Sequence, residues 1–158
     1  MNSLQTVPPM YSDSTALPDP DTQSEFYADI PTKRLLAWLV DMVLIAVVSA
    51  IIVPFTAFTG LFFFPALMLV VGFLYRTITL TTSSATWGMR LFSIEFRDRT
   101  GRTFDFGSAI LHTLGYHISI SVFPLQIVSI ILMLTSARKQ GLTDYFMGSV
   151  AINRPARY

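Results

Sequence analysis

The chain has 158 residues, of which 52% are apolar and only 13% are charged. Soluble globular domains carry about 25% charged residues, so too little polar surface is left to cover a water-soluble globule of this size. The composition predicts an integral membrane protein rather than a soluble enzyme; a net charge of +1 gives no sign of nucleic-acid binding, and the lack of cysteine excludes a disulfide scaffold.

Residues 1–30 differ from the rest of the chain. They contain four prolines, many serines and threonines, five acids and no lysine or arginine. A segment with this charge and no apolar periodicity is predicted to be a disordered acidic tail. The aromatic stretch 24–27 leaves two alternatives open: it docks locally or it binds a partner. The remaining residues, 31–158, are predicted to form one membrane domain.

Two long apolar runs predict two transmembrane helices. The first covers about residues 34–53, with Thr32 as the expected N-cap and Asp41 as the acid inside it. The second covers about residues 64–82 and carries Arg76 near its end. At about 1.5 Å per residue, a helix of this length nearly matches a hydrocarbon core of about 30 Å. The sequence therefore predicts two helices joined by a short turn without charge.

The segment of about residues 88–105 changes character. Apolar and polar residues alternate on both sides of the stretch 98–101, which contains a glycine and is typical of a turn. Period-2 alternation around such a turn predicts a short amphipathic β-hairpin or an interfacial loop on the cytoplasmic side.

The last apolar stretch, about residues 107–136, is too long for one straight span. A helix of this length would measure about 45 Å, and Pro124 lies near its middle. Two alternatives stay open, a re-entrant hairpin that turns at Pro124 or a single tilted span. A tail of about residues 137–158 follows. The expected fold class is thus an all-α membrane protein with one small hairpin or loop.

The placement of lysine and arginine predicts the orientation. The turn between the first two helices contains neither residue, whereas both outer flanks of these helices do. The positive-inside rule therefore places the N-terminus in the cytoplasm, and we expect the bacterial plasma (inner) membrane as the location. A re-entrant third segment would put all eleven Lys and Arg residues on that side. A single span would leave four of them outside.

Charged residues within the apolar runs are the main candidates for function. Arg34 and Asp41 are seven residues apart and share nearly one helix face. An acid inside the bilayer costs about 2.5–3.5 kcal/mol on insertion scales, so it needs a partner. We expect Asp41 to pair with Arg76 across the two helices. In the alternative, Arg76 extends to the interface and Asp41 meets a backbone donor or water.

No residue pattern indicates catalysis or a cofactor. His112 and His117 are five residues apart and do not share a helix face, so a metal site is not expected, and buried or interfacial histidines are the simpler interpretation. Asp144 follows a basic cluster and either caps a short helix or joins the charge network. No nucleophile, phosphate-binding or zinc-binding motif is present. We expect no enzyme, no cofactor and no metal.

Three segments in order resemble the RDD family of small integral membrane proteins. These are the spacing Arg34-x2-Ala37-x3-Asp41, the stretch ATWGMRL at 85–91, and RKQGLTD at 138–144 leading to Gly-Ser-Val at 148–150. The resemblance covers about residues 31–153. It implies that Arg34, Asp41 and Asp144 fill the roles of the arginine and two aspartates for which the family is named. Thr143 stands where many members have histidine, and Trp-Gly-Met at 87–89 replaces a more usual Leu-Gly-Lys.

Two hypotheses of function follow from these residues and the resemblance. The first is transport of an ion or of a proton-coupled small solute, with Asp41 as the titrating group, because intramembrane carboxylates mark ion or proton paths. Two full spans and a broken segment cannot easily enclose a transport path. This hypothesis therefore requires a homo-oligomer or another membrane protein, in addition to the lipid bilayer. The second is a membrane adaptor or assembly factor in which the charged residues are structural.

Overall fold

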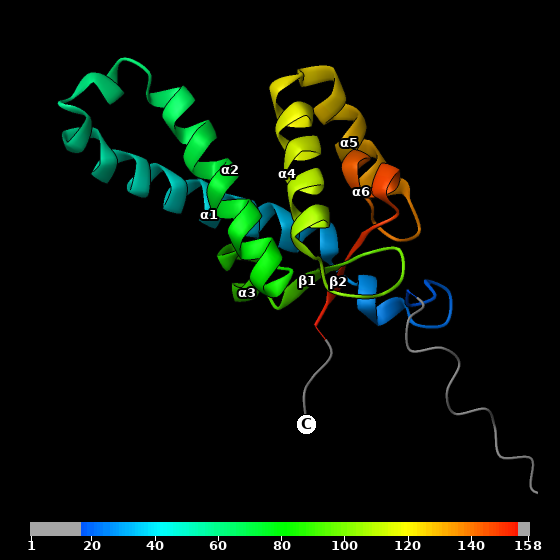
Figure 1. The fold of residues 1–158 in the computed structure, drawn as a ribbon. Helices are drawn as coiled ribbons and strands as arrows, with labels where there is room; N and C mark the ends of the chain where they lie inside the picture. The colour runs from blue at the N-terminus through cyan, green and yellow to red at the C-terminus, as the bar shows by residue number, and fades with distance from the viewer. Residues whose placement is uncertain (1–16, 155–158) are drawn as a thin grey trace, which may run out of the picture.

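The computed structural model describes residues 17–154 of the chain (Figure 1). The described part is mainly helical, with one pair of short strands. In chain order the elements are η1 (Ser24–Tyr27), α1 (Ile30–Ile52), η2 (Val53–Thr56), η3 (Thr59–Leu61), α2 (Phe64–Ser83), α3 (Trp87–Leu91), β1 (Ile94–Arg97), α4 (Phe106–Ser121), α5 (Phe123–Thr135), α6 (Leu142–Met147) and β2 (Val150–Asn153).

The two predicted long helices are confirmed as α1 and α2, and both are long and apolar enough to cross a membrane. Many of their large apolar side chains are exposed, as expected of helices surrounded by lipid. Helix α1 begins at Ile30, so the expected N-cap at Thr32 is wrong. Pro31 occupies the first turn, where its fixed φ suits a helix, and the Lys33 amide already bonds to the Asp29 carbonyl at 2.9 Å.

The core lies at one end of these helices, next to the strands, while the connection between α1 and α2 lies at the far end (Figure 1). Small residues allow the helices to approach one another there. A Cβ at Gly88 of α3 would lie 2.2 Å from the Ala37 carbonyl oxygen of α1. The glycine in the ATWGMRL segment is therefore required by the close contact between α3 and α1.

Strand β1 does not pair with the segment after its turn, so the predicted hairpin is wrong. The Asp98–Gly101 turn is formed, with the Gly101 amide 2.9 Å from the Asp98 carbonyl, but the chain then continues without a strand into α4. Strand β1 instead pairs antiparallel with β2, with Ile94 opposite Asn153. The reason is burial: the first three residues of β2 are all buried and apolar, whereas Arg102 and Thr103 are exposed.

The segment just before α1 is attached to β2. Tyr27 of η1 is buried and its hydroxyl donates to the Pro18 carbonyl at 2.8 Å. The Asn153 side chain donates to the carbonyls of Glu25 and Ala28 at 2.8 and 3.0 Å. Of the two alternatives for residues 24–27, the structure has local docking. This part of the predicted disordered tail is therefore ordered, and its residues 1–16 lie outside the described residues, as do 155–158.

The third apolar stretch is broken near the predicted proline. Helices α4 and α5 meet at Val122 with a bend of 115°, and Pro124 lies in the first turn of α5, where no amide donor is needed. Figure 1 shows the two helices leaving the same turn and running back toward the core side by side. The stretch is thus two short helices rather than one straight helix.

Candidate binding cavity

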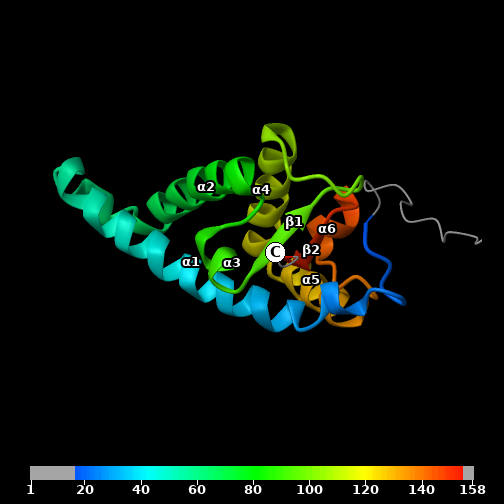
Figure 2. The same cartoon turned by 90° about the horizontal axis from the view of Figure 1, so that it is seen from below.

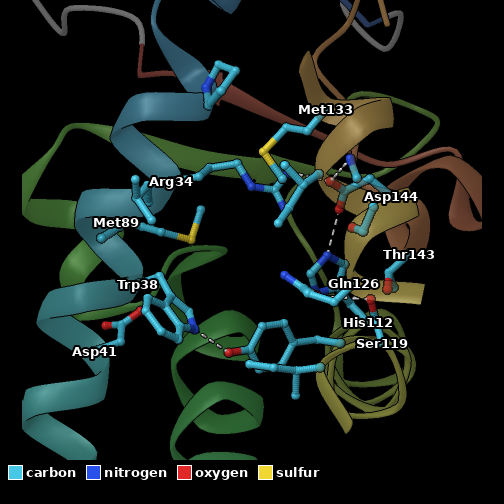
Figure 3. Close-up of a pocket in the computed structure, with 18 of the residues that line it drawn as sticks. Arg34, Trp38, Asp41, Met89, His112, Ser119, Gln126, Met133, Thr143 and Asp144 are labelled. Carbon is cyan, nitrogen blue, oxygen red and sulfur yellow. Dashed lines mark hydrogen bonds and ion pairs between the residues drawn. The ribbon is translucent and has the colours of Figure 1, made fainter. Parts of the chain in front are cut away.

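A cavity of about 590 Å³ separates α1 from α4, α5 and α6. Figure 2, which views the molecule from below, shows α1 running along one side of the other helices, and Figure 3 shows side chains from both sides of the cavity pointing into it. Most of the lining is apolar, yet it includes two arginines, two aspartates and a histidine. Charged groups held in a largely apolar cavity are the principal candidates for a binding site.

The charged cluster at one end of the cavity joins three helices. The guanidinium of Arg34, from α1, forms an ion pair with the Asp144 carboxylate of α6. The second Asp144 oxygen lies 2.7 Å from His112 Nε2 of α4. Asp144 is fully buried and Arg34 is 18% exposed in its side chain, so the pair is largely removed from water. The cluster connects α1, α4 and α6 (Figure 3).

The position of Asp144 follows from the local sequence. Gly141 precedes α6, and its amide donates to the Asp144 carboxylate at 2.9 Å, as in a helix cap. Burial raises the pKa of Asp144, but the Arg34 guanidinium and the His112 hydrogen bond outweigh burial and hold that pKa below its ordinary value. The aspartate both caps α6 and joins the charge network, the two roles that its sequence position allowed.

Asp41 lies at a different junction. One carboxylate oxygen accepts from the Tyr75 hydroxyl at 2.6 Å and from the Gly88 amide at 2.9 Å, and the other accepts from the Thr86 hydroxyl at 2.6 Å. These donors come from α2 and from the start of α3. The expected ion pair between Asp41 and Arg76 is absent from the described residues. Two hydroxyl groups and one backbone amide occupy both carboxylate oxygens, so Asp41 is satisfied by neutral donors.

Arg76 faces the cavity from α2. It is 7% exposed, and its guanidinium carbon lies 4.0 Å from the centre of the Tyr116 ring of α4. The Tyr116 hydroxyl in turn accepts from the Trp38 indole at 2.8 Å, which links α1 to α4. Within residues 17–154, Arg76 Nε has no hydrogen-bond partner. This cation is stabilised by an aromatic face but not by an anion.

The other wall of the cavity is held by polar contacts across the break between α4 and α5. The Ser119 hydroxyl of α4 donates to the Gln126 side-chain oxygen of α5 at 3.1 Å. The Leu142 amide of α6 donates to the Ser129 hydroxyl of α5 at 3.0 Å. These bonds keep α5 and α6 close to α4, while the cavity separates α5 from α1.

The structure thus brings Arg34 and Asp144 together and places Asp41 and Arg76 elsewhere on the same cavity wall. His112 was expected to be a buried or interfacial histidine; it is buried, and it also contacts Asp144. Its spacing from the buried Ala109 and Thr113 marks one inward face of α4 and could have indicated this position. The imidazole beside Asp144 comes from α4, whereas position 143 holds threonine. Among the described residues, no three His, Asp or Glu side chains gather as metal ligands.

A profile of the RDD family matches residues 29–148, which is most of the chain. The chain belongs to the RDD family, and the resemblance carried by the three sequence segments is confirmed. No curated protein and no solved structure matches it. The match includes Arg34, Asp41 and Asp144 together with the helices that hold them.

Proposed function

We propose that the chain transports an ion or a small solute across a membrane, with the cavity between α1 and α4–α6 as its binding site. The observation that carries the proposal is a cavity of about 590 Å³ lined by Arg34, Asp144, His112 and Arg76 in a chain whose surface is largely apolar. Ionisable side chains at such a site are energetically costly. Their presence is therefore typical of a site that binds a ligand or transfers protons. The chain is not an enzyme in this proposal.

The titrating group in this proposal is His112, which contacts the Asp144 carboxylate, in place of Asp41. Both Asp41 oxygens are engaged by neutral donors that fix α1 to α2 and α3. Asp144 is shared between a permanent cation and an imidazole, and histidine is the side chain whose ordinary pKa lies nearest neutral pH. A proton gained or lost there changes the charge that faces the cavity.

The proposed topology has the α1–α2 connection on the outer side of the plasma membrane of a bacterium. Helices α4 and α5 form a re-entrant hairpin, so that the strands, α6 and the N-terminus all lie in the cytoplasm. Supporting this, residues 54–60 contain no lysine or arginine, and Arg97, Arg154 and Lys33 all lie around the strands. A multi-pass unit this small would complete its path as a homo-oligomer or with another membrane protein.

The test is dissipation of a pH gradient in proteoliposomes, with sodium, potassium or chloride as the counter-ion. Wild type is expected to dissipate the gradient, and Asp144→Asn to lose most of that activity. The matched control is Asp21→Asn, which makes the same change on an exposed side chain outside the cavity. Equal rates for wild type, Asp144→Asn and empty liposomes would contradict transport.

A second candidate function, a membrane adaptor, is supported by α5. None of its residues is buried, although most are large and apolar. In the adaptor hypothesis this helix binds a transmembrane partner, and the charged cluster only holds α6 in place. Two results together would favour the adaptor. The wild type would be inert in liposomes but co-purify with one fixed membrane partner, and substitution of exposed α5 residues would abolish that co-purification.

A further inference from the structure

Within residues 17–154, Arg76 is the cavity-lining cation that forms no ion pair. Arg34 is neutralised by Asp144, and Asp41 is bound by hydroxyl and amide donors. Arg76 is more than nine-tenths buried, lines the cavity and leaves Nε without a partner in the described part of the chain. A buried guanidinium without an anion is costly, so the site is suited to an anion supplied by a ligand.

The geometry of the guanidinium favours a planar or tetrahedral oxyanion. Its central carbon lies 4.0 Å from the centre of the Tyr116 ring, and Nε has no hydrogen-bond partner within residues 17–154. Arginine binds carboxylates and phosphates through the edge of its guanidinium, because the N–H donors match the spacing of the two oxygens. The aromatic contact therefore orients the group that would bind the anion.

The mouth of the cavity is apolar and exposed. It is bordered by Leu35 of α1 on one side and by Ile130 and Leu134 of α5 on the other, with exposed fractions of 58%, 46% and 59%. These residues belong to the faces that α1 and α5 present to lipid. A ligand can thus enter from the bilayer and leave an alkyl chain between α1 and α5 while its polar end reaches inward.

We infer that the cavity binds an anionic amphiphile from the bilayer, an acidic headgroup of carboxylate or phosphate type on an alkyl chain. Arg76 holds the headgroup, and the space between α1 and α5 holds the chain. This inference rests on the proposed function, because it names the substrate class of the same cavity. The inference follows because a buried cation without an ion-pair partner, Arg76, and an apolar opening between α1 and α5 belong to the same cavity.

The binding test uses bromine quenching of Trp38, which lines the cavity next to Tyr116. The chain has two tryptophans, so Trp87→Phe leaves Trp38 as the single reporter. In nanodiscs, 2-bromoundecanoate, whose bromine lies next to the carboxylate and so near Trp38, is expected to quench it saturably, with reversal by unbrominated undecanoate. The cationic analogue 2-bromoundecyl-trimethylammonium should quench without saturation. Butyrate should compete far more weakly, by about fourfold per missing methylene, whereas a site for free anions would bind butyrate and undecanoate alike.

Arg76→Gln is expected to weaken undecanoate binding at least tenfold, and the matched change Arg99→Gln, on an exposed arginine of the turn, to leave it unchanged. A second variant does not disturb the core: Ile130→Phe fills the exposed mouth without adding a tryptophan, and it should weaken undecanoate binding while butyrate binding stays the same. Equal binding of the anion and the cation, or unchanged binding in both Arg76→Gln and Ile130→Phe, would overturn the inference.

The two proposals fail in different ways. Saturable, anion-selective quenching without any flux in liposomes would remove transport and leave the ligand class standing. Gradient dissipation together with equal quenching by the anion and the cation would remove the ligand class and leave transport standing.

Discussion

Helix α1 carries two charged positions that meet two different environments. At Asp41 it joins α2 and α3 through the hydroxyls of Tyr75 and Thr86 and through a backbone amide. At Arg34 it joins α4 and α6 through Asp144, which also contacts His112. At the first junction, neutral donors bind a carboxylate. At the second, an arginine and an aspartate form an ion pair, and a histidine contacts the other oxygen of the aspartate.

The difference separates fixed structure from exchangeable charge. Hydroxyl and amide donors satisfy a carboxylate at any physiological pH and hold one geometry. An arginine, an aspartate and a histidine in contact change their interaction energy whenever a proton moves. Both junctions line the same cavity, but only the second consists of charged groups whose interaction changes when a proton moves. Four substitutions or conditions test this comparison.

The largest effect is expected at the neutral junction from Gly88→Ala. The new Cβ would lie 2.2 Å from the Ala37 carbonyl oxygen and 2.8 Å from an Asp41 oxygen, so backbone must move. We expect a loss of more than about 3 kcal/mol and poor recovery of folded protein, measured by thermal unfolding in detergent. The control Gly107→Ala meets its nearest neighbour at 3.7 Å and should be neutral or up to about 1 kcal/mol more stable.

The charged junction is tested by Asp144→Asn, with an expected cost of about 3 kcal/mol because a largely buried Arg34 loses its anion. The double variant Arg34→Gln with Asp144→Asn should lose less than the sum of the two single variants, since the remaining charge is no longer stranded. Additive losses in thermal unfolding would show that the two side chains do not stabilise each other.

Tyr75→Phe removes one of three donors from Asp41 and also removes the acceptor of the Trp87 amide. Thr86 and Gly88 still bind the carboxylate, so we expect a smaller loss of about 1–2 kcal/mol. Gradient dissipation in liposomes should be retained if Asp41 is structural. The control is Tyr145→Phe, the same change on a 63% exposed side chain. Loss of transport with normal stability in Tyr75→Phe would return the proton-transfer role to Asp41.

The smallest effect is the acid dependence of the charged junction. The folded pKa of Asp144 lies below its ordinary value of about 3.9, so the stability from its ion pair is complete well above pH 4 and is lost as the pH falls. The loss reaches less than about 0.5 kcal/mol at pH 4 and about 1 kcal/mol at pH 3. Melting temperatures of wild type and Asp144→Asn should therefore converge on acidification; a difference that widens would reverse the assigned direction.

Hydropathy was sufficient to predict α1 and α2, because a long apolar run has few alternatives to a helix in a membrane. Pro124 and the length of the third stretch were sufficient to predict a break as one of two alternatives, and the structure has the break at Val122. The strand pairing was not predictable from local pattern, since β1 pairs with residues more than fifty positions later, while the nearer segment has a turn and the same alternation. Burial of the C-terminal strand decides the pairing, and burial depends on the whole fold.

Only part of the candidate site was predictable from the sequence, because the contacts of its residues also depend on the whole fold. Asp41 was found because a charge in an apolar run is conspicuous. Arg34 and Asp144 were added by the family resemblance. The partner of Asp41 was assigned to Arg76 because opposite charges were the visible choice. Thr86 and Gly88 were seen only as members of a family segment, since neutral donors leave no mark on charge or hydropathy. His112 was set aside because its pairing depends on how α4 faces α6.

The contacts that close the fold join residues very far apart in the chain. Arg34 binds Asp144 across 110 positions, Lys33 binds Asn153 across 120, and Asn153 also fixes the segment before α1. During synthesis α1 and α2 are therefore made while Arg34 still lacks its anion, and the cavity gains its last wall only when α6 has been made. Closure of the cavity is a late event that an early stop or a stalled ribosome would leave undone.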